Sequence, residues 1–346
     1  MRLPTLASPP MKVDGGIPPD LDAVPEAARA VEAAGYDGAW AAETSHDVFL
    51  PLLLAAEHTA RLELGTGIAV AFPRSPMHLA VMGHDLQAYS KGRFLLGLGS
   101  QIKAHIEKRF SATWTKPAAR MRELILATRA IWDCWNEGTK LDFRGDFYTH
   151  TLMTPFFNPG PNTYGPPRVF LAAVGARMTE VAGEVCDGLL AHGFTTESYL
   201  RETTLPALER GLAKVGRSRA DFEISLPVFV VTGTNEDQMT KADRSVREQI
   251  AFYGSTPAYR GVLETHGWGD LQDELNVLSK QGQWAEMGDL IDDDVRDTFA
   301  VVGEPEDVPR LIRSRYGDIV DRVSFYAPYR SDPERWRAVL AGFKAD

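Results

Sequence analysis

An unbroken alternation of short apolar strands with helices predicts an α/β protein, a closed (β/α)8 barrel of parallel strands. Eight segments rich in apolar and β-branched residues are separated by helical segments, as parallel pairing requires, because each parallel strand needs a crossover connection. No tandem repeat or Gly/Ser linker interrupts the pattern. The 346 residues, 44% of them hydrophobic, suffice for one large core. A doubly wound open sheet is the alternative architecture.

The N-terminal part of the chain is expected to contain four strands, of which the first three are each followed by a helix. A strand at Met11–Asp14 precedes an Ala-rich helix at Leu21–Ala34, which stops at Gly35, a residue suited to a left-handed C-cap. A second strand follows at Asp37–Glu43 and leads into an apolar helix at Asp47–Ala60. The pattern continues with strand Leu62–Val70, helix Pro76–Tyr89 and strand Gly92–Gly99.

The remaining chain completes the expected barrel. A long helix at Ala118–Trp135 is followed by strands at Arg168–Val174, Asp187–His192, Phe222–Val231 and Asp321–Ala327, and a closing helix at Pro333–Phe343. The segment from about 253 to 301 is too long for a plain connection and is expected to be an insertion between strands seven and eight. We therefore expect a single domain over residues 1–346.

Composition restricts the partners. The formal net charge of −10 argues against nucleic-acid binding. Two distant cysteines, Cys134 and Cys186, form neither a disulfide framework nor a Cys-x-x-Cys pair, which fits a reducing cytoplasm. The N-terminus lacks the pattern of a signal peptide, and the apolar run Phe49–Ala56 is too short to span a membrane. A small organic molecule is the expected partner.

In a parallel barrel the site residues follow the carboxyl ends of the strands. This rule selects a short set of positions. They are Asp14 after strand one, Glu43, Thr44 and His46 after strand two, residues 67–72 of strand three, Ser100, Gln101 and Lys103 after strand four, residues 175–178 after strand five, and His192 after strand six.

The stretch "LLGLGSQIKAH", residues 95–105, places two glycines at the end of strand four. It fails as a dinucleotide-binding fingerprint because the third glycine is missing and the unit stands fourth in the chain. Two interpretations stay open. Gly97 and Gly99 allow neighbouring strands to pack closely, or the polar residues after them, Ser100 to His105, face a ligand.

The turn after strand five, in "AAVGARMTEVAGE", is a candidate phosphate site. Gly175 permits close backbone approach, the following helix offers free N–H groups, and Arg177 is a possible countercharge. The alternative is an ordinary turn in which Gly175 supplies a positive φ. The eight histidines form no His-x-His or His-Glu-x-x-His pattern, so no metal site is expected.

Several segments, in this order, resemble the bacterial luciferase-like superfamily of flavin and deazaflavin oxidoreductases, over nearly the whole chain. The markers are residues 30–44, 61–80, 89–101, 166–192 and 320–326. Two further segments, residues 97–123 and 252–268, resemble a branch assigned to coenzyme F-420, an 8-hydroxy-5-deazaflavin.

The resemblance implies specific site residues. A non-prolyl cis peptide behind the cofactor ring corresponds to Gly67–Ile68, with Ala69 and Val70 beside it. Phosphate contacts correspond to Ala173, Val174, Gly175, Ala176 and Arg177, and the strand-four loop contributes Ser100 and Gln101, with Lys103 placed to meet the acidic tail of the deazaflavin. Many relatives have a histidine directly after the acidic residue of strand two, whereas this sequence has Thr44 there and His46 two positions later.

The resemblance implies an oxidoreductase that moves a hydride between C5 of coenzyme F-420 and an organic substrate. Glu43 and His46 are the candidates for the accompanying proton transfer, with Asp14 third. Trp40, Phe72 and Trp114 are either apolar walls of the site or plain core. An FMN-dependent monooxygenase and a non-catalytic flavin-binding barrel are the alternatives, and relatives suggest a homodimer or higher homo-oligomer.

Overall fold

The strand order is that of a (β/α)8 barrel, as expected. The computed structural model describes residues 10–330 and 333–345, so residues 1–9 of the N-terminal stretch discussed above lie outside it. The main sheet has the order β11-β10-β12-β1-β2-β3-β5-β8-β9, and β9 also pairs with β10. The eight barrel strands are β1 (Lys12–Gly16), β2 (Gly38–Ala41), β3 (Glu63–Thr66) with β4 (Ala69–Val70), β5 (Phe94–Gly99), β8 (Arg168–Ala173), β9 (Gly188–Ala191), β10 (Glu223–Val231) and β12 (Arg322–Tyr326).

The chain forms two compact units, which we describe separately. Unit 2 contains residues 15–192 and 199–223, and unit 1 contains the described residues before 15, residues 193–198 and the described residues from 224 onward. Within unit 2, strands β2, β3, β5, β8 and β9 pair in parallel in that order. Within unit 1, β12 pairs in parallel with both β1 and β10.

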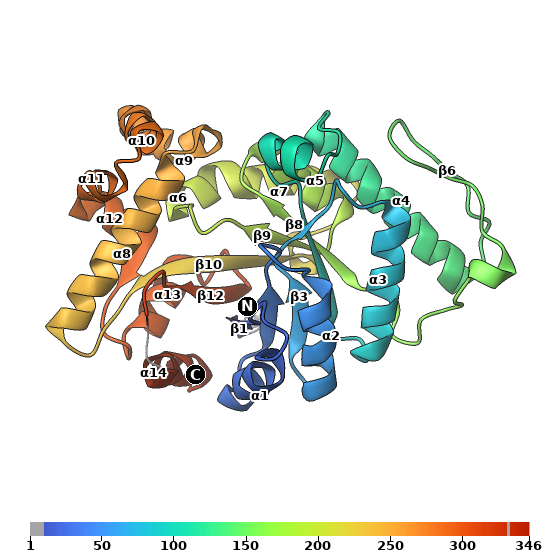
Figure 1. The fold of residues 1–346 in the computed structure, drawn as a ribbon, viewed down its shortest axis with the longest axis horizontal. Coiled ribbons are helices and arrows are strands. Elements are labelled where there is room, and N and C mark those ends of the chain that lie inside the picture. The colour runs from blue at the N-terminus through green and yellow to red at the C-terminus, as the bar shows by residue number, and fades with distance from the viewer. Residues whose placement is uncertain (1–9, 331–332, 346) are drawn as a thin grey trace, which may run out of the picture. The chain divides into compact units, whose positions relative to one another are not determined.

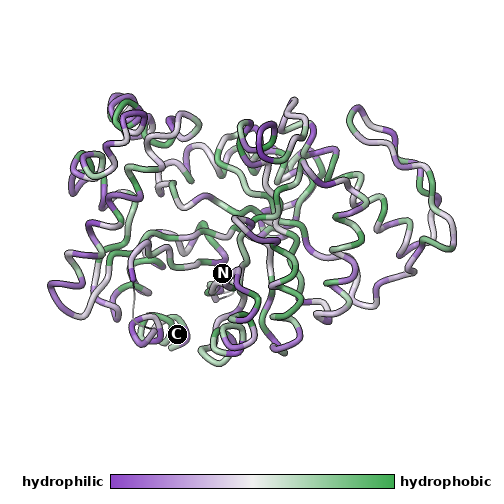
Figure 2. Tube along the Cα trace, in the orientation of Figure 1, coloured by the Kyte–Doolittle hydropathy of each residue, from purple (hydrophilic) through white to green (hydrophobic). Residues whose placement is uncertain are grey.

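The helices of unit 2 cover its strands with apolar faces. They are α1 (Val24–Ala34), α2 (Phe49–His58), α3 (Pro76–Tyr89), α4 (Pro117–Glu137), α5 (Ala176–Val185) and α7 (Leu205–Lys214). The expected left-handed C-cap at Gly35 is confirmed, with φ of 92°. Figure 1 shows α3 and α4 side by side, where Gly83 leaves room for the Trp132 ring and Trp132 Nε1 donates to the Ala80 carbonyl at 3.0 Å. The apolar stretch of α2 is visible in green in Figure 2.

Between α4 and β8, unit 2 carries elements that the sequence pattern did not predict. They are the hairpin β6 (Phe143–Arg144) and β7 (Thr149–His150) and a 3-10 turn at Pro155–Phe157. The strand-four loop contains a π-helical turn at His105–Arg109, and another π-helical turn at Leu200–Thr204 precedes α7. Each of these segments has only two to five residues, too few to show a helical or strand periodicity in the sequence.

Unit 1 contains the segment expected to be an insertion. Its helices are α8 (Glu236–Gly254), α9 (Arg260–Glu264), α10 (Gly269–Gln281), α11 (Trp284–Asp289), α12 (Asp293–Phe299), α13 (Val308–Tyr316) and α14 (Pro333–Lys344), with the three-residue α6 (Glu197–Tyr199) at its border. A short strand, β11 (Ala300–Val302), pairs with the end of β10. Phe194 packs here against Phe299, Tyr259 and Tyr253, with ring centroids 4.6 to 6.2 Å apart.

Three differences from the expected strand boundaries affect the expected site. The first strand extends to Gly16, so Asp14 lies within it rather than after it. The second strand ends at Ala41, two residues early, and Glu43 beyond it accepts the backbone N–H of Val70 in the third strand. The third strand is interrupted after Thr66 and resumes at Ala69, a break that the continuous apolar pattern concealed.

Candidate functional site

The break in the third strand forms a bulge at the carboxyl end of the sheet in unit 2, where Gly67 and Ile68 are half-buried. Gly67 donates its N–H to the Ala41 carbonyl at 2.7 Å, and the Gly67–Ile68 peptide is cis, as the resemblance predicted. Ala69 and Val70 are fully buried and pair with Leu98 and Gly99 of β5. The bulge therefore has a defined position against β5, while β2 has already ended on its other side.

Glu43 binds this bulge directly. Its carboxylate, with a side chain only 7% exposed, accepts the Val70 N–H at 2.7 Å and a hydrogen bond from Arg74 Nη1 at 2.7 Å. Arg74 Nη1 also donates to the Val70 carbonyl at 2.8 Å. Arg74 was missed in the sequence, although it follows strand three by only four residues within one of the family markers.

His46 lies in the same loop as Glu43 but is exposed. The neighbouring Asp47 caps α2, where its Oδ1 accepts the N–H groups of Phe49 at 2.8 Å and Leu50 at 3.1 Å. Arg109 from the strand-four loop donates to the Thr44 carbonyl. The loop is thus fixed at both ends and leaves the His46 imidazole accessible to solvent and solutes.

Asp14 belongs to unit 1 and has a different environment from the one expected. It is buried within β1, and its two carboxylate oxygens accept hydrogen bonds from Nη2 and Nε of Arg322, each at 2.8 Å. Both side chains are completely buried. A bidentate buried pair of this kind fixes the orientation of the carboxylate, so the geometry favours a structural role for Asp14 over proton transfer.

The end of strand four combines both interpretations of the "GLGS" stretch. A Cβ on Gly97 would overlap the Thr66 carbonyl, and one on Gly99 would lie 2.6 Å from Ile68 Cδ1, so close packing explains both glycines. Ser100 is half-buried and donates to the Gln101 carbonyl at 3.1 Å. Gln101 has a φ of 58° and its side chain accepts the Ile102 N–H. Lys103 is exposed, and its Nζ lies 3.9 Å from Glu107 Oε1.

The turn after β8 leaves an open helix N-terminus. Gly175 is the N-cap of α5, and no side chain caps this helix end. Its φ is −79°, so the prediction of a positive φ at this glycine is wrong. A Cβ on Gly175 would meet nothing within 4 Å, and both Gly175 and Arg177 are exposed. Ala173 is buried, Val174 and Ala176 are half-buried, and the Val174 carbonyl accepts from the Tyr199 hydroxyl at 3.1 Å.

The three aromatic candidates pack within unit 2. The Trp40 ring fills the space over Gly65, and its centroid lies 5.7 Å from that of Phe170 in an edge-to-face arrangement. Phe72 is buried and meets Trp114 edge-to-face at 5.6 Å. Trp40 and Trp114 are half-buried, so each combines a packed face with an accessible edge.

Two further strand ends carry ionisable groups. His192 follows β9, and burial lowers the pKa of its imidazole to about 4. In unit 1, Tyr326 ends β12, and its hydroxyl lies 2.8 Å from that of Tyr253. Burial, followed by the Tyr253 hydrogen bond, raises the pKa of Tyr326 well above its usual range. The strand-end rule identifies Tyr326 once it is applied to the eighth strand.

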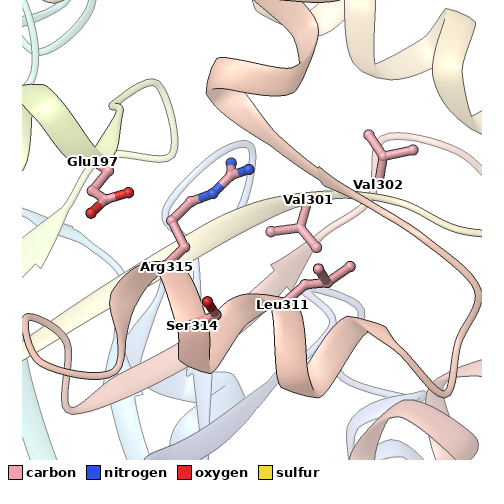
Figure 3. A pocket seen from close by; sticks show the side chains of 6 residues that line it. All are labelled: Glu197, Val301, Val302, Leu311, Ser314 and Arg315. Atoms are coloured by element: carbon pink, nitrogen blue, oxygen red, sulfur yellow. The ribbon is translucent and has the colours of Figure 1, made fainter.

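Unit 1 also contains a pocket of about 260 Å³ that includes none of the expected site residues. It is lined by Glu197 of α6, Val301 and Val302 of β11, and Leu311, Ser314 and Arg315 of α13 (Figure 3). Arg315 donates to the Ala300 carbonyl at 3.0 Å. Arg315 thus helps to join α13 to the start of β11.

Residues 10–330 and 333–345 contain neither a candidate metal cluster nor a candidate membrane-spanning helix. In this part of the chain, no group of three or more His, Cys, Asp or Glu side chains is arranged to hold a metal ion. None of its helices is both long and apolar enough to cross a membrane.

Known proteins are similar to this chain in sequence and in fold. A model of the luciferase-like monooxygenase family matches residues 1–322. An uncharacterized protein of Mycobacterium tuberculosis is 58% identical over 313 residues, which are 90% of this chain and 92% of that protein. A 5,10-methylenetetrahydromethanopterin reductase of Archaeoglobus fulgidus is 28% identical, over 89% of this chain and 90% of the reductase. The solved structure of a coenzyme F420 dependent tetrahydromethanopterin reductase from Methanopyrus kandleri has a TM-score of 0.78 and 21% identity, covering 96% of this chain and 98% of that one.

Proposed function

The chain belongs to the luciferase-like monooxygenase family, and from that premise we propose that it is a coenzyme F-420-dependent oxidoreductase. The reaction is transfer of a hydride between C5 of the deazaflavin and a small organic substrate. One observation carries the proposal. Unit 2 contains a bulge after β3 whose backbone is bound by the side chains of Glu43 and Arg74, and it also contains an open N-terminus of α5 after β8 that no side chain caps. The reductase relatives support a deazaflavin as the cofactor.

The residues present fit a flavin-like group. The N-terminus of α5 offers unpaired backbone N–H groups and the positive end of the helix dipole, which suit a phosphate. The space in front of Gly175 is open, and Arg177 is the nearby cation. We assign the phosphate to Ala173–Arg177, the ring to Gly67–Val70, and further polar contacts to Ser100 and Gln101. Lys103, exposed on the strand-four loop, suits the acidic tail that distinguishes coenzyme F-420 from FMN.

The deazaflavin supplies the hydride chemistry when it is bound, and the protein supplies position, exclusion of water and a proton. Gly67 and Ile68 of the bulge are half-buried and offer accessible surface to the ring, whereas Ala69 and Val70 are fully buried. His46 is our candidate for exchanging the proton at its imidazole, because it is accessible and lies in the loop that carries Glu43. His192, whose pKa burial lowers to about 4, carries a neutral imidazole at pH 7.

Titration of the purified protein with each cofactor tests the proposal. We expect coenzyme F-420 to bind with a dissociation constant below about 1 μM, equivalent to about −8 kcal/mol, and FMN to bind more weakly. His46→Ala should leave the dissociation constant within about twofold and lower turnover by the 10² to 10⁴-fold typical of a lost general acid. Tight binding of FMN with no binding of coenzyme F-420 would reject the deazaflavin assignment.

An FMN-dependent monooxygenase is the second candidate function, and the name of the matching family favours it. Both cofactors share a tricyclic ring and a ribityl phosphate, so the same residues serve either. Oxygen consumption separates the two candidates. Reduced FMN bound to the protein should consume oxygen rapidly if this alternative holds, whereas reduced deazaflavin reacts sluggishly. A barrel that binds its ligand without turnover would show neither reaction.

We also propose that the enzyme is cytoplasmic and forms a homodimer or a higher homo-oligomer. Cys134 and Cys186 are free and buried. Helices α2 and α3 of unit 2 expose Leu50, Leu53, Val81 and Tyr89, each between 41% and 50% exposed. Exposed apolar side chains on neighbouring helices are typical of a subunit interface. Light scattering of the purified protein measures its mass directly.

A further inference from the structure

Within the described part of the chain, the backbone of Val70 has a strand neighbour on one side, β5, and none on the other. The preceding strand β3 pairs with β2 up to Thr66 and Ala41, and the Gly67 N–H makes the last bond to β2. Among the strands that the structure describes, the bulge beyond this point pairs with β5 alone, where the Ala71 N–H donates to the Gly99 carbonyl. A buried residue such as Val70 still requires partners for its own N–H and carbonyl groups.

Two charged side chains supply those partners. Glu43 accepts the Val70 N–H, and Arg74 donates to the Val70 carbonyl and to the same carboxylate oxygen of Glu43. The three contacts close a triangle with distances of 2.7, 2.8 and 2.7 Å. The carboxylate–guanidinium pair thus takes the place of the missing strand, with hydrogen bonds strengthened by charge.

Residues at the start of α2 and just before it contact Arg74. Its guanidinium lies 5.4 Å from the centroid of the Phe49 ring, and its Nη2 lies 3.6 Å from Asp47 Oδ2. Phe49 is buried and Asp47 caps the helix, so both are fixed by the helix. The triangle therefore connects α2, the strand-two loop and the bulge within unit 2.

We propose that Glu43 and Arg74 are positioning residues, which fix the bulge that backs the cofactor ring, and that Glu43 is not the group that transfers the proton. This inference rests on the proposed function, because the bulge is assigned to the ring there. A Glu43 side chain that accepts hydrogen bonds from both an arginine and a backbone N–H is suited to holding the bulge in shape. Proton exchange with the substrate then belongs to another residue of the loop.

The test uses Glu43→Gln, Arg74→Gln and the double variant. Glu184→Gln is the matched control, because Glu184 has a side chain 11% exposed and binds Arg122, but accepts no backbone N–H group of the bulge. Hydrogen exchange of residues 67–72 is measured without cofactor, followed by the dissociation constant of coenzyme F-420 and the pH profile of kcat. Arg74→Lys keeps the charge and serves if the neutral variants fail to fold.

Each single variant should accelerate amide exchange in residues 67–72 and weaken cofactor binding, both by at least about tenfold, the loss expected for one charged hydrogen bond. The double variant should be little worse than the worse single variant, because both act on one triangle. The pH profile of kcat should keep its shape in Glu43→Gln. The exchange rate and the dissociation constant of Arg74→Lys should lie between those of the wild type and of Arg74→Gln. The control should match the wild type in both quantities.

Other results overturn the inference. Glu43→Gln with wild-type exchange in residues 67–72, and a pH profile that has lost one ionisation, would make Glu43 the proton-transferring group. A general fall in Tm with no local change in exchange would make the pair an ordinary structural contact. If the wild type binds no coenzyme F-420, the proposed function fails, and the exchange data still show separately whether the triangle holds the bulge.

Discussion

Two carboxylates, Glu43 and Asp14, each meet an arginine, and their surroundings give them different roles. Glu43 uses one oxygen for both a backbone N–H and Arg74, at the edge of an interrupted strand. Asp14 uses both oxygens for Arg322, and no part of either side chain reaches solvent. The first arrangement shapes a segment of the site, and the second neutralises a charge inside the barrel strands of unit 1.

Replacing Asp14 should therefore destabilise the protein. Asp14→Asn leaves the buried Arg322 guanidinium without a compensating charge, and we expect the free energy of unfolding to fall by about 3 to 5 kcal/mol. Urea denaturation measures the change. Asp142→Asn, which breaks the exposed pair with Arg144, is the control and should cost less than about 1 kcal/mol. Equal effects of the two substitutions would contradict the structural role of Asp14.

His192 should make stability depend on pH. Burial lowers its pKa from 6.5 to about 4, so between these values the unfolded chain binds more protons than the native protein. The contribution of His192 to the free energy of unfolding is fully present above about pH 6.5. It is lost as the pH falls from about 6.5 to about 4, and the loss reaches about 3 kcal/mol. Urea denaturation between pH 7 and 4.5 should show a smaller loss for His192→Asn than for the wild type. His46→Gln, at an exposed position, should match the wild type; equal pH dependence in all three proteins would refute the prediction.

The eight strands illustrate which elements the sequence predicted. Each was expected from its apolar composition, and each is present, because a strand buried on both faces carries a continuous apolar run. The interruption of the third strand was not visible in "LELGTGIAV", since it depends on contacts from Glu43 and Arg74 elsewhere in the chain. The resemblance, and not the pattern, located it at Gly67–Ile68.

The site residues likewise include some that the strand-end rule predicted and some that it did not. Glu43, Ser100 and Gly175 follow strand ends as expected, because barrel topology fixes those positions. Arg74 escaped the rule because it lies four residues beyond its strand and acts through the backbone of Val70. Asp14 met the rule only while the first strand was thought to end there.

The N-terminus of α5 gives a prediction about one glycine. Gly175→Ala adds a methyl group to open space at a φ of −79°, so stability should change by less than about 0.5 kcal/mol. The same methyl group occupies space assigned to the phosphate, and the dissociation constant of coenzyme F-420 should rise by about tenfold, which is about 1.4 kcal/mol. Calorimetric titration measures it. An unchanged constant would place the phosphate elsewhere.

One side chain of α4 binds the backbone of the hairpin β6–β7. The Glu123 carboxylate accepts the N–H groups of Asp146, Phe147 and Tyr148 at 2.6 to 2.8 Å. Glu123→Ala should loosen residues 143–150 and make them sensitive to limited proteolysis, while Tm changes little because the segment is largely exposed. Glu137→Ala, at the other end of α4, is the control. Wild-type resistance to protease in Glu123→Ala would show that the hairpin is held by other contacts.

At the scale of the whole molecule, family and fold agree while the specific chemistry depends on the site. The family model covers residues 1–322, and the fold matches a reductase structure over 96% of the chain. A barrel of this kind supports many reactions. The claim of deazaflavin chemistry therefore depends on where the cofactor binds in unit 2.

A crystal structure of the protein with coenzyme F-420 tests that claim most directly. The account predicts the phosphate within hydrogen-bonding distance of the backbone N–H groups at the start of α5, and the ring against Gly67–Val70. Glu43 should remain bound to Val70 and Arg74 in the complex. Crystals that take up FMN but no deazaflavin, or a deazaflavin bound away from both segments, would contradict it.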